Sequence, residues 1–186
     1  MVRTVVVALL MAGCAAQGWA GEIPSADVAQ WTQATRVVQA LRVVRVEASS
    51  QYPTDGSNYD PGNAVDGDPT TAWFPQRTDR ANKGEWIRFH FASNVVLDRV
   101  ELINGWIKDD RLWRHNSRVK KAILGFSDGT AQVIELADTQ NRLRFALPGR
   151  TTRWVQLTID EIYPGAQWNI ESGITDVYFS GSQAAR

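Results

Sequence analysis

The stretch Trp86-Ile87-Arg88-Phe89-His90-Phe91 decides the fold, because large apolar residues occupy every second position from Ile87 onward. Successive side chains of a β-strand point to opposite faces of the sheet. This spacing therefore places Ile87, Phe89 and Phe91 on one buried face and the charged residues on the other. The stretch predicts a half-exposed β-strand.

The same alternation recurs along the chain and predicts about eight strands. The further apolar positions are Val44 and Val46; Val100 and Leu102; Ala122, Leu124 and Phe126; Ile134 and Leu136; Leu143, Phe145 and Leu147; Val155, Leu157 and Ile159; Val177 and Phe179. Turn residues such as Ser127-Asp128-Gly129-Thr130 separate them. Because no pattern for a three-turn helix interrupts the strands, the sequence predicts an all-β sandwich or jelly roll.

Two polar segments, 49–85 and 104–118, do not have the pattern of strands. The first is rich in Gly, Asp, Asn, Pro and Ser and is too long for a hairpin loop. Within the second, Asn104-Gly105 is a strong turn signal, which we expect to project Trp106 and Lys108 from a sheet edge. Long loops on a rigid sandwich are common places for function.

The charge balance gives no support to some classes of partner. The 186 residues include 20 Lys and Arg and 20 Asp and Glu, so the net charge is zero. This balance gives no general reason to bind nucleic acid or an anionic membrane surface. The eight tryptophans are many for this length and suit a surface on which rigid rings stack on ligands.

The amino terminus predicts export to the bacterial envelope. Residues 1–20 contain Arg3 and a short apolar run that is too short to span a bilayer. Cys14 is the only cysteine and follows Met11-Ala12-Gly13, which resembles a lipobox. We therefore expect lipid on Cys14 and a location in the periplasm or at the outer membrane; the alternative is ordinary cleavage near Gly18-Trp19-Ala20. Residues 21–41 are interpreted as a connector and residues 42–182 as the β-sandwich domain.

An ordered succession of motifs over roughly residues 46–180 resembles a known family. The motifs are Ala48-Ser49-Ser50; Asn63-Ala64-Val65-Asp66-Gly67-Asp68 with Thr71-Ala72-Trp73; Gly84-Glu85-Trp86-Ile87; Asn104-Gly105-Trp106-Ile107-Lys108; Asn116, Arg118 and Lys120; Phe126 with Asp128-Gly129; Leu136 with Asp138; and Tyr163-Pro164-Gly165. They resemble discoidin-like (coagulation-factor type C) domains, in the branch named after a module of a secreted NAD-degrading toxin. The resemblance implies a galactose-binding-like jelly-roll β-sandwich and a glycan-binding or translocation role, without the toxin's catalytic domain. Trp106 stands where this branch has tyrosine.

The sequence favours binding over catalysis. His90 alternates with core phenylalanines, and His115 has no serine or cysteine nucleophile beside it in a motif. The adjacent pairs Asp109-Asp110 and Asp160-Glu161 point their carboxylates in different directions on a strand or loop. We therefore expect no enzymatic activity.

The predicted ligand-binding residues lie in segment 104–118 and combine aromatic with charged or amide groups. They are Trp106, Lys108, Trp113, Arg114, Asn116 and Arg118. Tryptophan stacks on sugar faces, and the polar groups bind hydroxyls. In a competing interpretation, the tryptophans fill a satellite core, and Arg118 and Lys120, opposite Val119, pair with Asp109, Asp110 or Asp138.

Two hypotheses for the function follow. The first is a non-catalytic module that binds a glycan or an envelope polymer through loops at one end of the sandwich. The second is a structural or assembly protein that docks on an envelope protein, with the same aromatic and arginine residues as a protein hot spot.

The resemblance also implies a structural calcium ion near the Asp66-Gly67 turn. The side-chain ligands would be Asp68, Thr71 and Asp176, with backbone carbonyls completing the coordination. The alternative is a metal-free Asp-Gly turn. We expect Trp73, which follows this turn, to pack beneath the end of the sandwich.

Overall fold

The computed structural model describes residues 37–53, 58–76 and 80–184. The predicted signal segment, Cys14 and most of the connector lie outside the described residues. The described elements, in chain order, are β1 (Gln39–Leu41), β2 (Val43–Ala48), the 3-10 helix η2 (Pro61–Val65), β3 (Trp86–Asn104), α1 (Asp110–His115), β4 (Asn116–Phe126), β5 (Ala131–Glu135), β6 (Leu143–Tyr163), β7 (Trp168–Ser172) and β8 (Ile174–Gln183).

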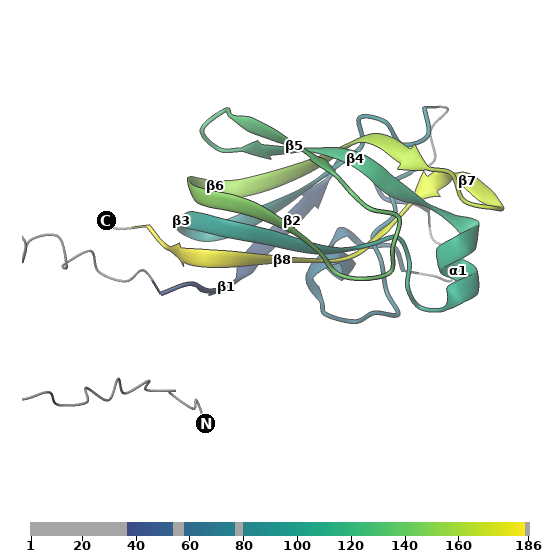
Figure 1. Cartoon of the computed structure of the whole chain (residues 1–186), viewed down its shortest axis with the longest axis horizontal. Coiled ribbons are helices and arrows are strands. Elements are labelled where there is room, and N and C mark those ends of the chain that lie inside the picture. Colours follow the sequence, from purple (N-terminus) through teal and green to yellow (C-terminus); the bar gives the residue numbers. More distant parts are fainter. Residues whose placement is uncertain (1–36, 54–57, 77–79, 185–186) are drawn as a thin grey trace, which may run out of the picture. The chain divides into compact units, whose positions relative to one another are not determined.

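The strands form an eight-stranded sheet that folds over into two layers (Figure 1). The strand order is β1-β8-β3-β6-β4-β5, and β2 and β7 pair with β3 and β4. Residues 86–90 of β3 pair with β2 and with 154–158 of β6, whereas 95–104 pair with β8 and with 143–152 of β6. Both long strands therefore cross from one layer to the other, and the all-β sandwich prediction is confirmed.

Four of the predicted strands are halves of two longer ones. The alternating stretches around Phe89 and Val100 both lie on β3, and those around Phe145 and Leu157 both lie on β6. The prediction of separate strands was wrong here, because the residues between them keep an extended backbone through the bend. Strand β1 begins at Gln39, within the segment interpreted as connector, and pairs with β8.

The two long polar segments leave the sheet at the same end of the sandwich. Ala48, the last residue of β2, pairs with Ile87, and Asn104, the last residue of β3, pairs with Ile174 at the start of β8. We call this the loop end; it carries segments 49–85 and 105–115. Figure 1 shows α1 and β7 there.

The opposite end, where β3 and β6 change layers, is the bend end. It contains residues 92–94, the β4–β5 turn at 127–130 and residues 148–152. Strand β1 and the last residues of β8 also lie there, because Gln183 pairs with Val95 beside the bend. The described chain thus begins and ends far from its longest loops (Figure 1).

The core lies between the two layers. Trp73 is fully buried, and its indole N–H donates to the Ser50 carbonyl at 3.1 Å, which confirms its expected packing beneath the sandwich end. The expectation for Val44 was wrong, since this side chain is 53% exposed. A register shift between Val43 and Arg45 turns Val44 outward, and Val43 and Val46 pack on the core instead.

Helix α1 is a short turn within the second polar segment. The Asp109 carboxylate caps it by accepting from the Leu112 N–H at 2.7 Å. Among the described residues, no helix has the length and apolar character needed to cross a membrane.

Candidate ligand-binding surface at the loop end

The turn after β3 fixes where Trp106 lies. The Asn104 side chain is fully buried and clamps β4 through two bonds with Val119, donating to its carbonyl at 2.7 Å and accepting from its N–H at 3.0 Å. Gly105 follows with φ +77°, and a Cβ there would lie 2.7 Å from Cγ of Arg118. Only glycine satisfies both the conformation and the close approach. The predicted turn is present, but it places Trp106 at the loop end from the end of the interior strand β3, not from a sheet edge as expected.

Trp106 belongs to a chain of aromatic rings, which we call the aromatic cluster: Tyr52, Tyr59, Phe74 and Trp106. The ring centroids of neighbouring members lie 5.2–5.9 Å apart in edge-to-face geometry. The Trp106 indole donates to the Thr70 carbonyl at 2.9 Å. Phe74 is buried, whereas the other three rings keep part of their surface in solvent.

The cluster has a cation at its edge. The Lys108 ammonium lies 5.7 Å from the Trp106 ring centroid, within cation–π range, and its side chain is exposed. Nearby, hydrogen bonds from Thr70 hold the pKa of Asp68 below its ordinary value, and the charge of Lys108 adds to this effect. The surface therefore combines aromatic faces with charges of both signs.

Arg118 has a structural partner rather than a free guanidinium. It is only 7% exposed and binds Asp138 through two bonds of 2.9 and 2.7 Å. It also donates to the Asn116 carbonyl at 2.8 Å, and its Cζ lies 4.8 Å from the Trp113 ring centroid. The competing interpretation is correct for Arg118, which pairs with Asp138, but wrong for Lys120, whose ammonium lies 3.0 Å from Glu161.

Asn116 and Trp113 hold α1 in place. The Asn116 side chain is buried and donates to the Leu112 carbonyl at 2.9 Å. Trp113 has a buried indole N–H without a hydrogen-bond partner in the described chain. Arg114 is exposed and lies 3.6 Å from Asp110. Of the six predicted residues, Lys108 and Arg114 are exposed, Trp106 and Trp113 are both partly buried, and Asn116 and Arg118 are buried.

Sequence reasoning missed the three other rings of the aromatic cluster. Tyr52, Tyr59 and Phe74 lie in segment 49–85, which carries no strand periodicity, so nothing in the pattern indicated that they meet Trp106. The available signal was the presence of aromatic residues in an otherwise small and polar loop.

The residues expected to bind calcium meet only in part. Gly67 has φ +77° and Asp66 accepts from the Asp68 N–H, which confirms the predicted turn. Asp68 binds Thr70, and the Thr71 hydroxyl donates to Asp66 at 2.9 Å, so both side chains serve their own turn. No group of three or more His, Cys, Asp or Glu side chains in the described residues is placed to hold a metal ion.

Within that set, Asp176 is the carboxylate whose charged form its surroundings disfavour. Its carboxylate is 1% exposed and accepts from the Gly67 N–H at 3.2 Å and the Tyr178 hydroxyl at 2.8 Å. Burial raises the pKa of Asp176, and the nearby charge of Asp66 adds to this effect. Asp66 and Asp176 are the two carboxylates here that would attract a cation, and calcium bound to them would serve structure, not chemistry.

Among the described residues, neither histidine forms a hydrogen bond with a serine or cysteine side chain. His90 lies 2.7 Å from Glu47, and the His115 ring packs edge-on against Trp168. Glu85, from the Gly84–Ile87 motif, accepts from the hydroxyls of Ser49 and Ser50 at 2.5 Å and so joins this motif to the Ala48-Ser49-Ser50 motif. Each of these contacts joins parts of the fold to one another.

The fold and its elaborated loop end define a discoidin-like β-sandwich domain. The chain matches the family described as the NAD glycohydrolase translocation F5/8 type C domain over residues 39–180, and it belongs to that family. The family resemblance inferred from the motifs is confirmed. No curated protein sequence matches the chain.

Solved structures share the fold at low sequence identity. The CBM32 domain of AlyQ in complex with 4,5-unsaturated mannuronic acid has a TM-score of 0.54 and 18% identity, covering 76% of this chain and 97% of that one. The family 32 module of C. perfringens NanJ in complex with galactose has a TM-score of 0.57 and 10% identity, covering 77% and 99%. Truncated AlyQ, with CBM32 and alginate lyase domains, has a TM-score of 0.56 and 18% identity; the match covers 81% of this chain but only 35% of that longer one.

Proposed function

We propose that this domain is a non-catalytic module that binds a glycan or envelope polymer at its loop end. The observation that carries the proposal is the aromatic cluster, with Trp106 half-buried and Lys108 at its edge. Half-buried rings offer flat apolar faces for a sugar ring, and a neighbouring ammonium donates to sugar hydroxyls.

The binding surface in this proposal differs from the one expected from sequence. Trp106 and Lys108 stay as direct contacts, Tyr59 joins them, and Arg114 lies at the rim. Trp113, Asn116 and Arg118 become the support that positions α1 and the turn at Gly105. The commitment of Arg118 to Asp138 also weakens the argument for a strongly acidic ligand.

The solved relatives support a glycan as ligand. One is in complex with galactose and another with 4,5-unsaturated mannuronic acid, which are neutral and acidic sugars respectively. The mixed charge around the aromatic cluster is compatible with either. His90 is held by Glu47, and the His115 ring packs on Trp168 with its Nδ1 buried and without a hydrogen-bond partner in the described chain, so neither lies beside a serine or cysteine nucleophile; this supports binding rather than catalysis.

A protein partner is the second candidate, and exposed valines favour it. Val37, Val38 and Val44 are 74%, 52% and 53% exposed; the first two directly precede β1, and Val44 lies on β2, and both strands lie at edges of the sheet. Exposed apolar side chains at a sheet edge suit docking of another protein. This surface lies at the bend end, so the two candidate functions use different ends of the domain.

A glycan array with the full chain separates these possibilities. The proposal predicts saturable binding to a defined group of glycans, with binding lost in Lys108→Ala and retained in Arg153→Gln, a change of another exposed cation away from the loop end. Absence of any glycan binding, together with copurification of one envelope protein, would replace the glycan proposal by the protein-docking one.

A further inference from the structure

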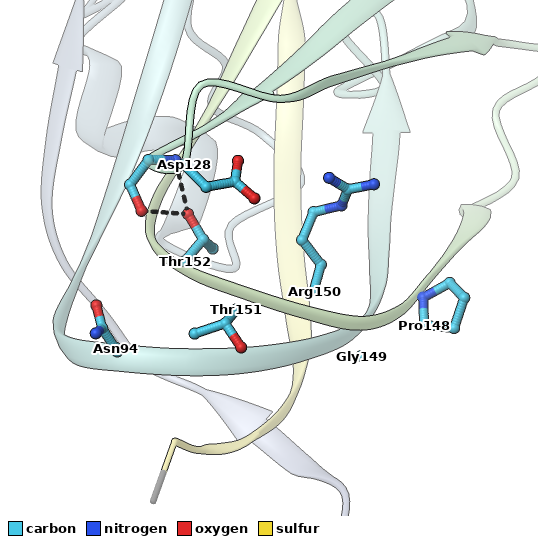
Figure 2. A pocket seen from close by; sticks show the side chains of 8 residues that line it. Asn94, Asp128, Pro148, Gly149, Arg150, Thr151 and Thr152 are labelled. Carbon is cyan, nitrogen blue, oxygen red and sulfur yellow. Dashed lines mark hydrogen bonds between the residues drawn. The ribbon is translucent and has the colours of Figure 1, made fainter. Parts of the chain in front are cut away.

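The bend end contains a hollow that is separate from the loop-end surface. Its volume is about 600 Å³, and its walls come from Asn94 at the bend of β3, Ser127 and Asp128 of the β4–β5 turn, and residues 148–152 of β6. This size lies within the range of small-molecule sites. Figure 2 shows the Asp128 and Arg150 side chains standing on the β4–β5 turn and on β6, with Asn94 and Thr151 beside them on the bend.

A carboxylate and a guanidinium face the hollow without pairing with each other. Asp128 uses Oδ1 to accept from the Thr130 N–H at 2.9 Å and from its hydroxyl at 2.6 Å. Arg150 donates one N–H to that same hydroxyl, and its Cζ lies 4.4 Å from the Phe126 ring centroid. Thr130 thus holds both charged groups in place, and Oδ2 of Asp128 and most of the Arg150 N–H groups stay available.

The charge state of Asp128 suits an acceptor. Its hydrogen bonds from Thr130 lower the pKa of Asp128, and Arg150 contributes in the same direction. The carboxylate is therefore ionised at neutral pH and accepts hydrogen bonds from hydroxyl groups, which are stronger when the acceptor carries a charge.

Neutral polar groups complete the lining. Neither the Asn94 amide nor the Thr151 hydroxyl forms a side-chain hydrogen bond with another described residue, and both side chains are exposed. Below them, the buried Thr152 hydroxyl accepts from the Ser127 N–H at 3.0 Å and donates to the Trp154 carbonyl at 2.6 Å. The floor is therefore fixed by strand β6, whereas the groups above it are free to bind.

We propose that the bend-end hollow is a second binding site, which takes a terminal neutral sugar residue through its hydroxyl groups. The Asp128 carboxylate repels an anion and the Arg150 guanidinium repels a cation. A neutral ligand with both hydrogen-bond donors and acceptors therefore fits best. Adjacent hydroxyls of a sugar meet this need by donating to Asp128 and accepting from Arg150 and Asn94.

The shape of the site argues for the end of a glycan rather than its interior. The bend of β3 and β6 closes one side of the hollow, and Arg150 covers the Phe126 ring, so no exposed aromatic face is offered for stacking along a chain. The two sites share no residue, so the domain would link two glycans or two parts of one glycan.

The test is a titration of the full, ¹⁵N-labelled chain with methyl β-D-glucopyranoside and methyl β-D-galactopyranoside, followed by amide chemical shifts. We expect at least one probe to shift the amides of residues 127–130 and 149–152 with a dissociation constant in the millimolar range, roughly 1–10 mM. Asp128→Asn, which keeps an acceptor for Thr130, should weaken this binding by about tenfold. Arg153→Gln, an exposed arginine next to the site, serves as the matched control.

Further titrations distinguish this proposal from the loop-end proposal. Lys108→Ala should leave the bend-end shifts unchanged even if it abolishes binding at the loop end. Glycine, a zwitterion, and sodium acetate, an anion, should shift these amides less than the neutral sugars. The proposal is overturned if neither sugar shifts the bend-end amides, if glycine or acetate binds there instead, or if Asp128→Asn binds as well as the parent while its other amide signals remain native.

Discussion

Arg118 shows how strongly the surroundings of a single residue decide its role. In sequence it is a basic residue beside tryptophans and resembles a ligand contact, yet its guanidinium is buried against Asp138 and Trp113. The partner lies twenty residues further along the chain, and a strand pattern carries no information about which loop returns to it. Trp106 was placed correctly because its position depends on the local turn at Asn104 and Gly105.

Arg118→Gln is expected to destabilise the domain. The change leaves Asp138 without its partner and removes the cation that packs on Trp113. Breaking a buried ion pair costs roughly 3–5 kcal/mol, and the loss here should lie at the lower end because Asp138 is partly exposed. Chemical denaturation measures it. Arg114→Gln, whose ion pair is exposed, should change stability by less than about 1 kcal/mol; equal stability of the two variants would show that the buried pair does not support the loop end.

Asp176 is the residue on which a calcium effect should depend. We expect Ca²⁺ to raise the melting temperature of the parent relative to EDTA, since an ion bound only to the folded state stabilises it by mass action. Asp176→Asn should remove this response, because the buried carboxylate beside Asp66 is the group that attracts a cation. Identical melts of the parent in Ca²⁺ and EDTA would establish a metal-free turn.

At the scale of elements, alternation predicted the strands well and their continuity poorly. Every predicted core stretch lies on a strand or directly follows one, but Ala92, Ser93 and Asn94 resemble a turn by composition and instead continue β3 around the bend. Composition cannot distinguish a turn from a bent strand, because the difference depends on pairing with β6 and β8. The exposed Val44 has a similar cause, a register shift that local pattern does not reveal.

An ion-pair network that joins β4 and β6 should make stability depend on pH. Asp160 lies 2.7 Å from the Lys83 ammonium and 3.2 Å from that of Lys121, and these bonds lower the pKa of Asp160. A lowered folded-state pKa means that the stabilisation is present above the ordinary pKa of aspartate and is lost as the pH falls through the folded value.

Asp160→Asn should therefore lower the melting temperature slightly at neutral pH and have a diminishing effect as the solution is acidified. Thermal melts of parent and variant across the acidic range measure the difference. A difference that stays constant, or grows, toward low pH would show that the network does not stabilise the fold through the charge of Asp160.

At the scale of the whole molecule, the two ends of the domain differ in the residues that they present. The aromatic cluster lies at the loop end, and the described chain begins beside β1 at the bend end. The sequence predicted that long loops would gather the function at one end of a sandwich. It did not predict the aromatic cluster, because Tyr59 and Phe74 lie in segment 49–85 whereas Trp106 follows β3, and only the folded sheet brings the two segments together.

The envelope anchor expected at Cys14 is a separate prediction, which concerns residues outside the described part of the chain. Cys14→Ser should move the protein from the membrane to the soluble fraction, since stable anchoring depends on the acyl chains. Fractionation with mass spectrometry of the amino terminus checks this; an unchanged membrane fraction and an unacylated parent would rule out the anchor.

The most direct test of the loop-end proposal is the affinity of Trp106→Ala for the glycan that binds the parent best, measured by isothermal titration calorimetry. Trp154→Ala is the matched control, because Trp154 is also half-buried but stacks on Arg88 on the face of the sheet. The proposal predicts that Trp106→Ala loses about 1–3 kcal/mol of binding free energy and stays folded, whereas Trp154→Ala binds as the parent does. A folded Trp106→Ala variant with undiminished affinity would contradict it.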